Sequence, residues 1–394
     1  MKTVFATTQS VTSRHFGIVC CCFVLTIGCS GSGVPPTQKI ELSPAAPVTA
    51  LAISTDGQIL ASGQFASLTN EGTLSLWDLR SGKKLADQKL GHFVPTALEF
   101  TDSDRHIVVG EASLVQPILP FDDSIRYRNN GAIKIFDVAP LHEDRSIDLT
   151  WSVYGLAIAP DEKHLAAVGG GADDKIRAVI VSTADGTRSE VLADDGPPAR
   201  IARANPLRQL QFSHDGTKLL IASMIPSGSA KLPGIQVIDV STGRSQSQWL
   251  FPESGVTWFD LDPADRSVAV IGRYGGSIWT IDDGWKRLNK EASVPNSPFR
   301  LLLNGKTRLY AIRKQPNEGP QLPFDAGITQ IGDGAILTGF VGELENCSAF
   351  ALNKTEQCFA IGDDQGHINV WKISSAVSND TKPDTSDSDR SAGK

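Results

Sequence analysis

Acidic side chains occur in three adjacent pairs, and paired carboxylates are the residues from which a calcium site could be built. The pairs are Asp122–Asp123, Asp173–Asp174 and Asp363–Asp364. Converging carboxylates can hold Ca²⁺ together with backbone carbonyl oxygens. An aspartate before a strand is also an ordinary turn former, because its side chain bonds the backbone two residues on. Both interpretations stay open, and we expect turn formation at these positions.

Other catalytic patterns are absent from the sequence. The seven histidines do not show the H-x-x-x-H spacing of a metal site. The glycine-rich run at Gly169–Gly171 lacks the Lys-Ser/Thr of a phosphate loop, and no Gly-x-Ser-x-Gly elbow occurs. The formal net charge of −7, without a basic stripe, disfavours nucleic acid as a partner. We therefore predict no catalytic residue, no cofactor and no bound metal, and expect a protein that is not an enzyme.

Six cysteines are distributed unevenly along the chain. Four lie within the first 29 residues, which leaves Cys347 and Cys358 in the body. These two flank a hairpin turn near Lys354–Glu356, at unequal distances from it. At about 3.3 Å per residue the offset is roughly 15–20 Å, well beyond the ~7 Å Cα separation of a disulfide. We predict two unpaired thiols.

The N-terminal segment has the pattern of an export signal. Lys2 and Arg14 precede an apolar run from Phe16 to Ile27, and small residues follow it. The apolar run is too short to span a bilayer as a helix. Gly28-Cys29-Ser30 resembles the bacterial lipobox, although Thr26 stands where leucine is usual. That resemblance implies lipid attachment at Cys29 and a location on the periplasmic or outer-membrane side of the bacterial envelope. An ordinary cleaved signal is the alternative.

Short apolar strands recur throughout the remaining chain. Seven repeats begin near Val48, Thr96, Tyr154, Leu207, Val256, Phe299 and Cys347. Each contains a hairpin turn rich in Asp, Asn, Gly or Ser, such as Ser54–Gly57 and Ser213–Gly216. A period of roughly 40–60 residues built from short strands is typical of a β-propeller, in which each four-stranded sheet is one blade. The sequence predicts an all-β, seven-bladed propeller.

The last repeat lacks a fourth strand, because its third strand runs directly into a polar tail. The segment Gln38–Leu42 alternates in polarity and precedes the first full repeat. We expect it to supply the missing strand and to close the ring, which would remove exposed sheet edges. The predicted organisation is a signal peptide over 1–28, a tether over 29–37, the propeller over 38–374 and a disordered tail over 375–394.

The third strands of the repeats resemble those of the WD40 family. The resemblance covers roughly Val48 to Ile373, in segments such as "GTLSLWD" and "GHINVWK". The family's buried His–Ser/Thr–Asp–Trp set is complete in no repeat, so the sheets should be held mainly by apolar packing. The resemblance assigns structural roles within the repeats to Trp77, Asp78, His92, Phe136, Asp137, Asp239, Asp282 and Trp371.

Insertions concentrate in the connections between second and third strands, on one face of the predicted propeller. They are Gln64–Glu71, Ala112–Asn130, Gly170–Asp174, Ser223–Pro233 and Lys314–Ala326. Long loops on one face of a rigid scaffold are where binding usually occurs. The second insertion mixes apolar, aromatic and arginine side chains, as interface anchors do. Its candidate partner-binding residues are Leu119, Phe121, Arg126, Tyr127 and Arg128.

Two classes of function fit these features. The first is a monomeric, non-enzymatic scaffold that binds proteins of the bacterial envelope and is held to the membrane by its N-terminal lipid. The second is a propeller enzyme of the lactonase or quinoprotein-like kind, with its site at the mouth of the central channel. A propeller that binds a small ligand or a metal is a third possibility. We expect the scaffold.

Overall fold

The computed structural model describes most of the chain between Val34 and Ile373. The described residues are 34–42, 46–115, 126–171, 176–194, 210–227, 230–251, 258–261, 265, 267–272, 275–281, 287–290, 299–303, 307–311, 326–330, 336–344, 347–353, 355 and 357–373. Every regular element among them is a β-strand. Within the same residues, no helix has the length and apolarity needed to cross a membrane.

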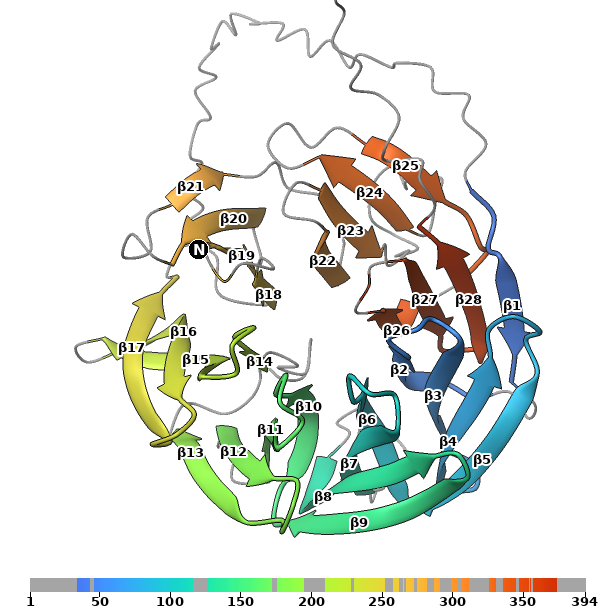
Figure 1. The fold of residues 1–394 in the computed structure, drawn as a ribbon, viewed down its shortest axis with the longest axis horizontal. Coiled ribbons are helices and arrows are strands. Elements are labelled where there is room, and N and C mark those ends of the chain that lie inside the picture. The colour runs from blue at the N-terminus through green and yellow to red at the C-terminus, as the bar shows by residue number, and fades with distance from the viewer. Residues whose placement is uncertain are drawn as a thin grey trace, which may run out of the picture. The chain divides into compact units, whose positions relative to one another are not determined.

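The strands form four-stranded antiparallel sheets, seven in the described part of the chain (Figure 1). Six sheets follow the order of the sequence, which is the arrangement of an up-and-down meander. The first three are β2(Val48–Ile53) to β5(Lys84–Gly91), β6(Phe93–Phe100) to β9(Leu141–Leu149), and β10(Ser152–Ile158) to β13(Arg188–Asp194). The next three are β14(Leu210–Phe212) to β17(Arg244–Leu250), β18(Trp258–Leu261) to β21(Arg287–Lys290), and β22(Phe299–Leu303) to β25(Ile336–Phe340).

The inner members of these six sheets complete the series. They are β3(Ile59–Ala66), β4(Glu71–Asp78), β7(His106–Val115), β8(Arg126–Val138), β11(His164–Gly170), β12(Ile176–Ser182), β15(Lys218–Ser227), β16(Ala230–Asp239), β19(Ser267–Gly272), β20(Gly275–Thr280), β23(Thr307–Ala311) and β24(Ala326–Gln330).

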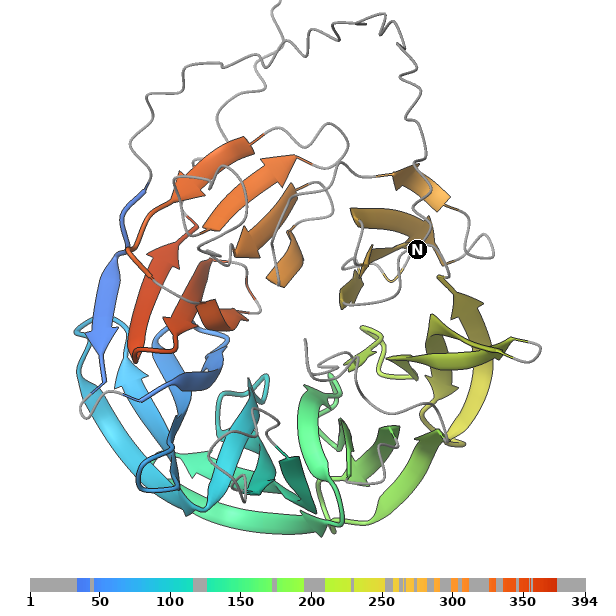
Figure 2. The ribbon, with the colours of Figure 1, turned by 180° about the vertical axis from the view of Figure 1, so that it is seen from behind.

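The seventh sheet joins the two ends of the described chain. Its order is β1-β28-β27-β26, with β1(Gln38–Glu41) beside β28(His367–Lys372), β27(Cys358–Asp363) and β26(Cys347–Leu352). Ile40 lies opposite Ile368 in this pairing. The blue strand β1 lies along the red strand β28 in both views (Figures 1 and 2). The predicted pairing of Gln38–Leu42 with the last repeat is confirmed, and β1 ends at Glu41.

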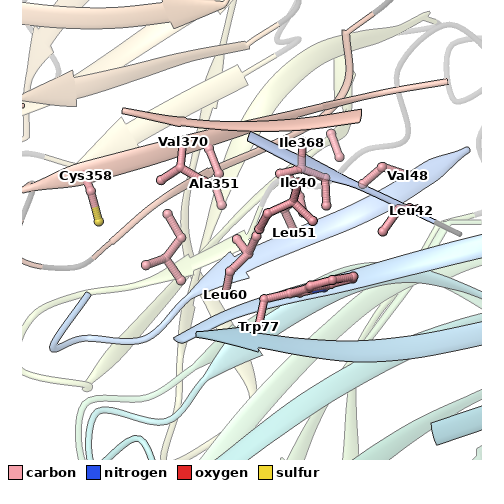
Figure 3. Close-up of a cluster of buried hydrophobic side chains, with 13 residues drawn as sticks. Ile40, Leu42, Val48, Leu51, Leu60, Trp77, Ala351, Cys358, Ile368 and Val370 are labelled. Carbon is pink, nitrogen blue, oxygen red and sulfur yellow. The ribbon is translucent and has the colours of Figure 1, made fainter. Parts of the chain in front are cut away.

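Apolar side chains fill the spaces between successive sheets. One cluster joins the β2–β5 and β6–β9 sheets through fully buried residues such as Leu74, Ile107 and Phe136. A second cluster joins the first and last sheets, where Ile40 lies among Leu51, Leu60 and Ile368 (Figure 3). Burial of apolar surface between the sheets is therefore the main attraction that holds them together, as expected.

A hydroxyl group on the first strand of several sheets adds a polar link to the next sheet. Each lies at a β-bulge, where one extra residue interrupts the strand pairing. Thr49 Oγ1 donates to the Pro95 carbonyl at 2.6 Å, and Ser348 Oγ donates to the Val48 carbonyl at 2.6 Å. Thr96 Oγ1 donates to the Val153 carbonyl at 2.5 Å. Each bulge thus directs the hydroxyl side chain at its position toward the neighbouring sheet.

Acidic residues in the first turns of three sheets make a second kind of link. Asp104, Glu162 and Asp265 adopt left-handed backbone conformations, with φ near +55°. Asp104 accepts hydrogen bonds from the backbone N–H groups of Thr55 and Asp56, at 2.7 and 3.1 Å. Glu162 likewise accepts from the Ser103 N–H, and Asp265 accepts from the His214 N–H. Each carboxylate therefore satisfies backbone donors in the turn of the preceding sheet.

Replacing Asp104 should separate the contribution of the carboxylate from that of its backbone conformation. We expect Asp104→Ala to lower the free energy of unfolding by about 2 kcal/mol, because it removes both hydrogen bonds and leaves a β-carbon in the left-handed region. Asp104→Gly should cost about 1 kcal/mol, since glycine adopts that conformation freely. Urea denaturation of both variants measures the difference. Equal losses of stability in the two variants would show that the left-handed conformation at position 104 does not contribute to the cost of the alanine substitution.

Candidate functional site

The residues assigned to the WD40-like pattern occupy structural positions. Trp77 is buried, and its Nε1 donates to Ser62 Oγ at 2.8 Å. Trp371 and Phe136 are fully buried. Trp371 stacks on Phe359, with ring centroids 5.0 Å apart and planes 12° apart. These aromatic side chains pack between sheets and are not available to a ligand.

The aspartates of the third strands hold the turns that follow. Asp78 Oδ1 accepts hydrogen bonds from the Ser81 backbone N–H and from Ser81 Oγ, at 2.6 and 2.7 Å. The Ser81 hydroxyl is the main reason that the pKa of Asp78 lies below its usual value. Asp239 accepts in the same way from Ser241 and Thr242. Asp137 lies 3.3 Å from His106 Nε2 across the strand pair. Asp282 falls outside the described residues.

His92 lies on the surface rather than within a buried hydrogen-bond set. Its Nδ1 is 2.9 Å from the Asn70 carbonyl oxygen, at the turn between β3 and β4. Asn70 has a φ of +53°, so the histidine supports a residue in a left-handed turn. This contact ties the β3–β4 turn to the link between two sheets.

The acid pairs do not form a metal centre in the described part of the chain. No group of three or more His, Cys, Asp or Glu side chains within it could hold an ion. Asp363 is buried and accepts hydrogen bonds from the Gln365 and His367 backbone N–H groups and from His367 Nδ1. It is a turn former, as expected. Asp122–Asp123 and Asp173–Asp174 lie outside the described residues.

The two ends of the insertion that carries the candidate partner-binding residues form strand, where we expected a loop over Ala112–Asn130; residues 116–125 lie outside the described residues. β7 continues to Val115 and β8 begins at Arg126, with Leu114 opposite Tyr127. The neighbouring strands end earlier: β6 pairs with β7 only as far as Ser113, and β9 pairs with β8 only from Gly131. The hairpin therefore projects beyond the other strands of its sheet. We call residues 112–115 and 126–131, which include this extension and the residues at its base, the projecting hairpin.

This strand extension places three of the five candidate residues on regular structure. Arg126, Tyr127 and Arg128 are consecutive residues of β8. Leu119 and Phe121 lie outside the described residues. The physical reason for the correction is that antiparallel pairing satisfies the backbone N–H and C=O groups, which a long open loop leaves to water.

A second predicted loop is also a hairpin. We expected an irregular insertion over Ser223–Pro233, but β15 and β16 stay paired to their ends, with Ser227 opposite Ala230. The Gln64–Glu71 connection is shorter than expected, since β3 reaches Ala66 and β4 begins at Glu71. Lys314–Ala326 lies outside the described residues except for Ala326, which begins β24.

Both thiols of the body are free and buried, as predicted. Cys347 lies opposite Asp363, whereas the Asn353 N–H bonds the Cys358 carbonyl, so the two cysteines are at different levels of the hairpin. Burial is the largest cause that raises the pKa of the Cys358 thiol to about 11. A thiol of this kind is a poor nucleophile at neutral pH.

The raised pKa predicts slow alkylation of Cys358. Iodoacetamide at pH 8 should modify it about a hundredfold more slowly in the native chain than in guanidinium, because an increase of two pKa units lowers the thiolate fraction about a hundredfold. Peptide mass spectrometry after timed quenching measures the rate at each cysteine. Native modification at the denatured rate would contradict the buried position.

A cleft of about 380 Å³ lies beside Cys358, between the first and last sheets. Its lining mixes charges, since Arg80 and Lys372 face it together with Asp56 and Asp78. Thr37 also lines it, so the cleft borders the start of β1. The mixture of charges selects no single class of ligand.

The sequence interpretation missed one buried ionisable residue, Glu111 on β7. Its side chain is fully buried, and neither carboxylate oxygen accepts a hydrogen bond. Lys134 Nζ lies 3.4 Å from Oε1, which is an ion pair without a well-formed hydrogen bond. Burial is the largest cause that raises the pKa of Glu111 to about 7. In the sequence, a glutamate in the apolar run "HIVVGEASLV" was the available signal.

Comparison with known proteins identifies the fold. Residues 37–78, which span β1 to β4, match the family described as "WD domain, G-beta repeat". The β-propeller domain of Cps50 (Swd1) from Myceliophteria thermophila superimposes with a TM-score of 0.60 at 15% sequence identity. That match covers 86% of this chain and 99% of the other. No curated protein matches the sequence. The fold is a β-propeller with WD40-like repeats.

Proposed function

We propose that the protein is a secreted scaffold of the bacterial cell envelope that binds another protein and catalyses no reaction. Its seven sheets would form one closed propeller, sealed by β1. The supporting observation is the projecting hairpin, which continues past the strands on either side of it. A hairpin held at its base by a packed sheet offers a partner a defined surface at small entropic cost.

Several further features support a binding role for the hairpin. In the strand register, Leu114 lies opposite Tyr127 and Val115 lies opposite Arg126. Tyrosine and arginine are enriched among residues that dominate binding energy at protein interfaces. On the adjacent sheet, the turn between β3 and β4 presents Leu68 with a fully exposed side chain. We infer that the partner contacts the projecting hairpin at Arg126, Tyr127 and Arg128. We propose Leu119 and Phe121, which lie outside the described residues, as further contacts.

Site-specific crosslinking tests this function. A photo-reactive p-benzoylphenylalanine would replace Tyr127 in one variant of the full chain and Asp102 in another. Asp102 is an exposed residue at the opposite end of β7, so it serves as the matched control. Irradiation of whole cells should yield a discrete crosslinked protein from position 127 and none from position 102. Identical products from both positions, or none from 127, would refute the proposed surface.

We further propose that a lipid on Cys29 holds the propeller at the membrane. Val34 is already fixed to the body, because its N–H donates to the Gly339 carbonyl at 2.8 Å and its carbonyl accepts from Trp371 Nε1 at 3.1 Å. Five residue steps from Cys29 to Val34 span at most about 18 Å. The mass of the mature N-terminus and the membrane fraction of Cys29→Ser test this proposal. An unmodified N-terminus would contradict it.

A further inference from the structure

Glu111 lies at the base of the projecting hairpin, three residues before Leu114. It is opposite Pro95 on β6 and Ala132 on β8, so apolar groups occupy both neighbouring strand positions. Neither carboxylate oxygen accepts a well-formed hydrogen bond within the described residues, and the Lys134 ammonium group lies 3.4 Å from Oε1. An ionised carboxylate in such a place lacks the water and donors that would stabilise its charge. A neutral carboxyl group occupies the same place with a much smaller desolvation penalty.

One lysine is shared between this buried carboxyl group and an exposed one. Lys134 Nζ lies 3.4 Å from Glu111 Oε1 and 3.4 Å from Glu143 Oε2 on β9. It also lies 5.9 Å from the centre of the Phe93 ring. Its side chain is only 16% exposed, whereas that of Glu143 is 39% exposed. Lys134 can therefore pair with Glu143 alone when Glu111 carries no charge.

The other charged groups around Glu111 do not stabilise its ionised form. Glu143 and Asp148 on β9 repel it. On the neighbouring sheet, Glu71 and Lys89 pair with each other at 2.8 Å. β3 contains no charged residue, and the charged groups of β6 and β4, apart from Glu71, are Glu99 and Asp78. Lys134 is thus the one cation that contacts Glu111 among the described residues.

The sheet-to-sheet packing at this level is tight. A β-carbon on Gly72 would come within 1.8 Å of the Phe93 carbonyl oxygen, and one on Gly63 would come within 2.8 Å of Pro95. Backbones that approach so closely leave no room for a hydration shell around a carboxylate. Ionisation of Glu111 therefore has one of two consequences. Either the charged form keeps a high free-energy cost, or the contact between the two sheets loosens and water enters.

We propose that protonation of Glu111 controls how firmly the base of the projecting hairpin is held against the β2–β5 sheet, and thereby regulates the partner surface by pH. This regulation rests on the proposed function for its biological meaning, but the structural change does not require a partner. The neutral carboxyl group corresponds to a firmly held hairpin. The ionised group draws water into the contact between the sheets and loosens β7 and β8 near Ala112 and Gly131. The pKa of about 7 places this change within the neutral range.

Hydrogen–deuterium exchange measures the change directly. Exchange of the full chain would be compared at pH 6 and pH 8.5, after correction for the intrinsic pH dependence of amide exchange. We expect protection of residues 112–115 and 126–131 to fall about tenfold at the higher pH in the wild type. Glu111→Gln should remove this fall. Glu143→Gln, the matched control, removes an exposed carboxylate and should keep the fall.

A second measurement applies to the unmodified chain and so does not depend on how a variant folds. The carboxyl ¹³C shift of Glu111 should titrate with a midpoint near 7, and a midpoint near the usual value of about 4.5 would overturn the proposal. A pH-dependent loss of protection that persists in Glu111→Gln would also overturn it. Neither experiment involves the partner. The crosslinking test at position 127 can therefore fail while the pH effect of Glu111 stands. Equally, the pH effect can be absent while the crosslinking test succeeds.

Discussion

Replacing Trp371 with alanine is expected to lower the free energy of unfolding by about 3–5 kcal/mol. The indole is fully buried, stacks on Phe359 and meets the edge of Phe340, with ring centroids 6.2 Å apart. Its removal leaves a cavity between two sheets that the surrounding aromatic rings cannot fill. It also leaves the Val34 carbonyl without the indole donor. Urea denaturation followed by circular dichroism measures the loss.

Trp371→Phe is the matched control for this prediction. Phenylalanine keeps a ring against Phe359 but cannot donate to the Val34 carbonyl, so we expect a smaller loss of about 1–2 kcal/mol. The difference between the two variants reports the packing of the indole. If both variants lost the same amount, the hydrogen bond to the N-terminal segment would account for the effect, and our assignment of the stabilisation to packing would be wrong.

Glu111→Gln should stabilise the protein at high pH and leave its stability almost unchanged at low pH. The folded pKa of about 7 lies above the unfolded value of about 4.5. Below pH 4.5 the group is protonated in both states and contributes no difference. As the pH rises from 4.5 through 7, the unfolded state releases its proton first, so the wild type loses stability. Above pH 7 the full loss is present.

The expected size of this effect is about 3 kcal/mol at pH 8, because each pKa unit corresponds to about 1.4 kcal/mol. The loss of the ion pair with Lys134 reduces the gain from the substitution, although Lys134 keeps Glu143 as a partner. Urea denaturation of the wild type and the variant from pH 4 to pH 8.5 measures the difference. A constant difference across this range would show that Glu111 keeps the same protonation state in the folded and unfolded chains.

Turn chemistry and strand alternation were sufficient to predict the arrangement of the strands. Ser54–Gly57 and Ser213–Gly216 form the expected turns, with Gly57 and Gly216 at φ near +68° and Asp56 and Asp215 accepting backbone N–H groups. The pairing of Gln38–Leu42 with the last repeat was predicted from two observations together, the alternating polarity of this segment and the missing fourth strand of the last repeat. The turns are local in sequence, and a short stretch of residues therefore contains the information that determines them.

The links between sheets could not be predicted in the same way. Asp104 lies in a polar turn of its own repeat, but its carboxylate accepts a hydrogen bond from a turn nearly 50 positions earlier. Thr49 and Ser348 gave no signal, because the bulges that orient their hydroxyls become visible only in the strand register. Glu111 was overlooked for a related reason. The burial of a strand residue depends on which sheet covers it, and the sequence of one repeat does not contain that information.

The pairing of β1 with β28 also determines when the chain can finish folding. Thr37 forms its hydrogen bonds with Val370, a residue 333 positions later in the chain. The ribosome delivers the N-terminal strand long before its partner, and Ile40 has no β28 to cover it during that interval. A chain that terminates before residue 367 would leave β1 unpaired, and its exposed edge would make the incomplete product a target for proteolysis. A stable molecule therefore requires that synthesis be completed.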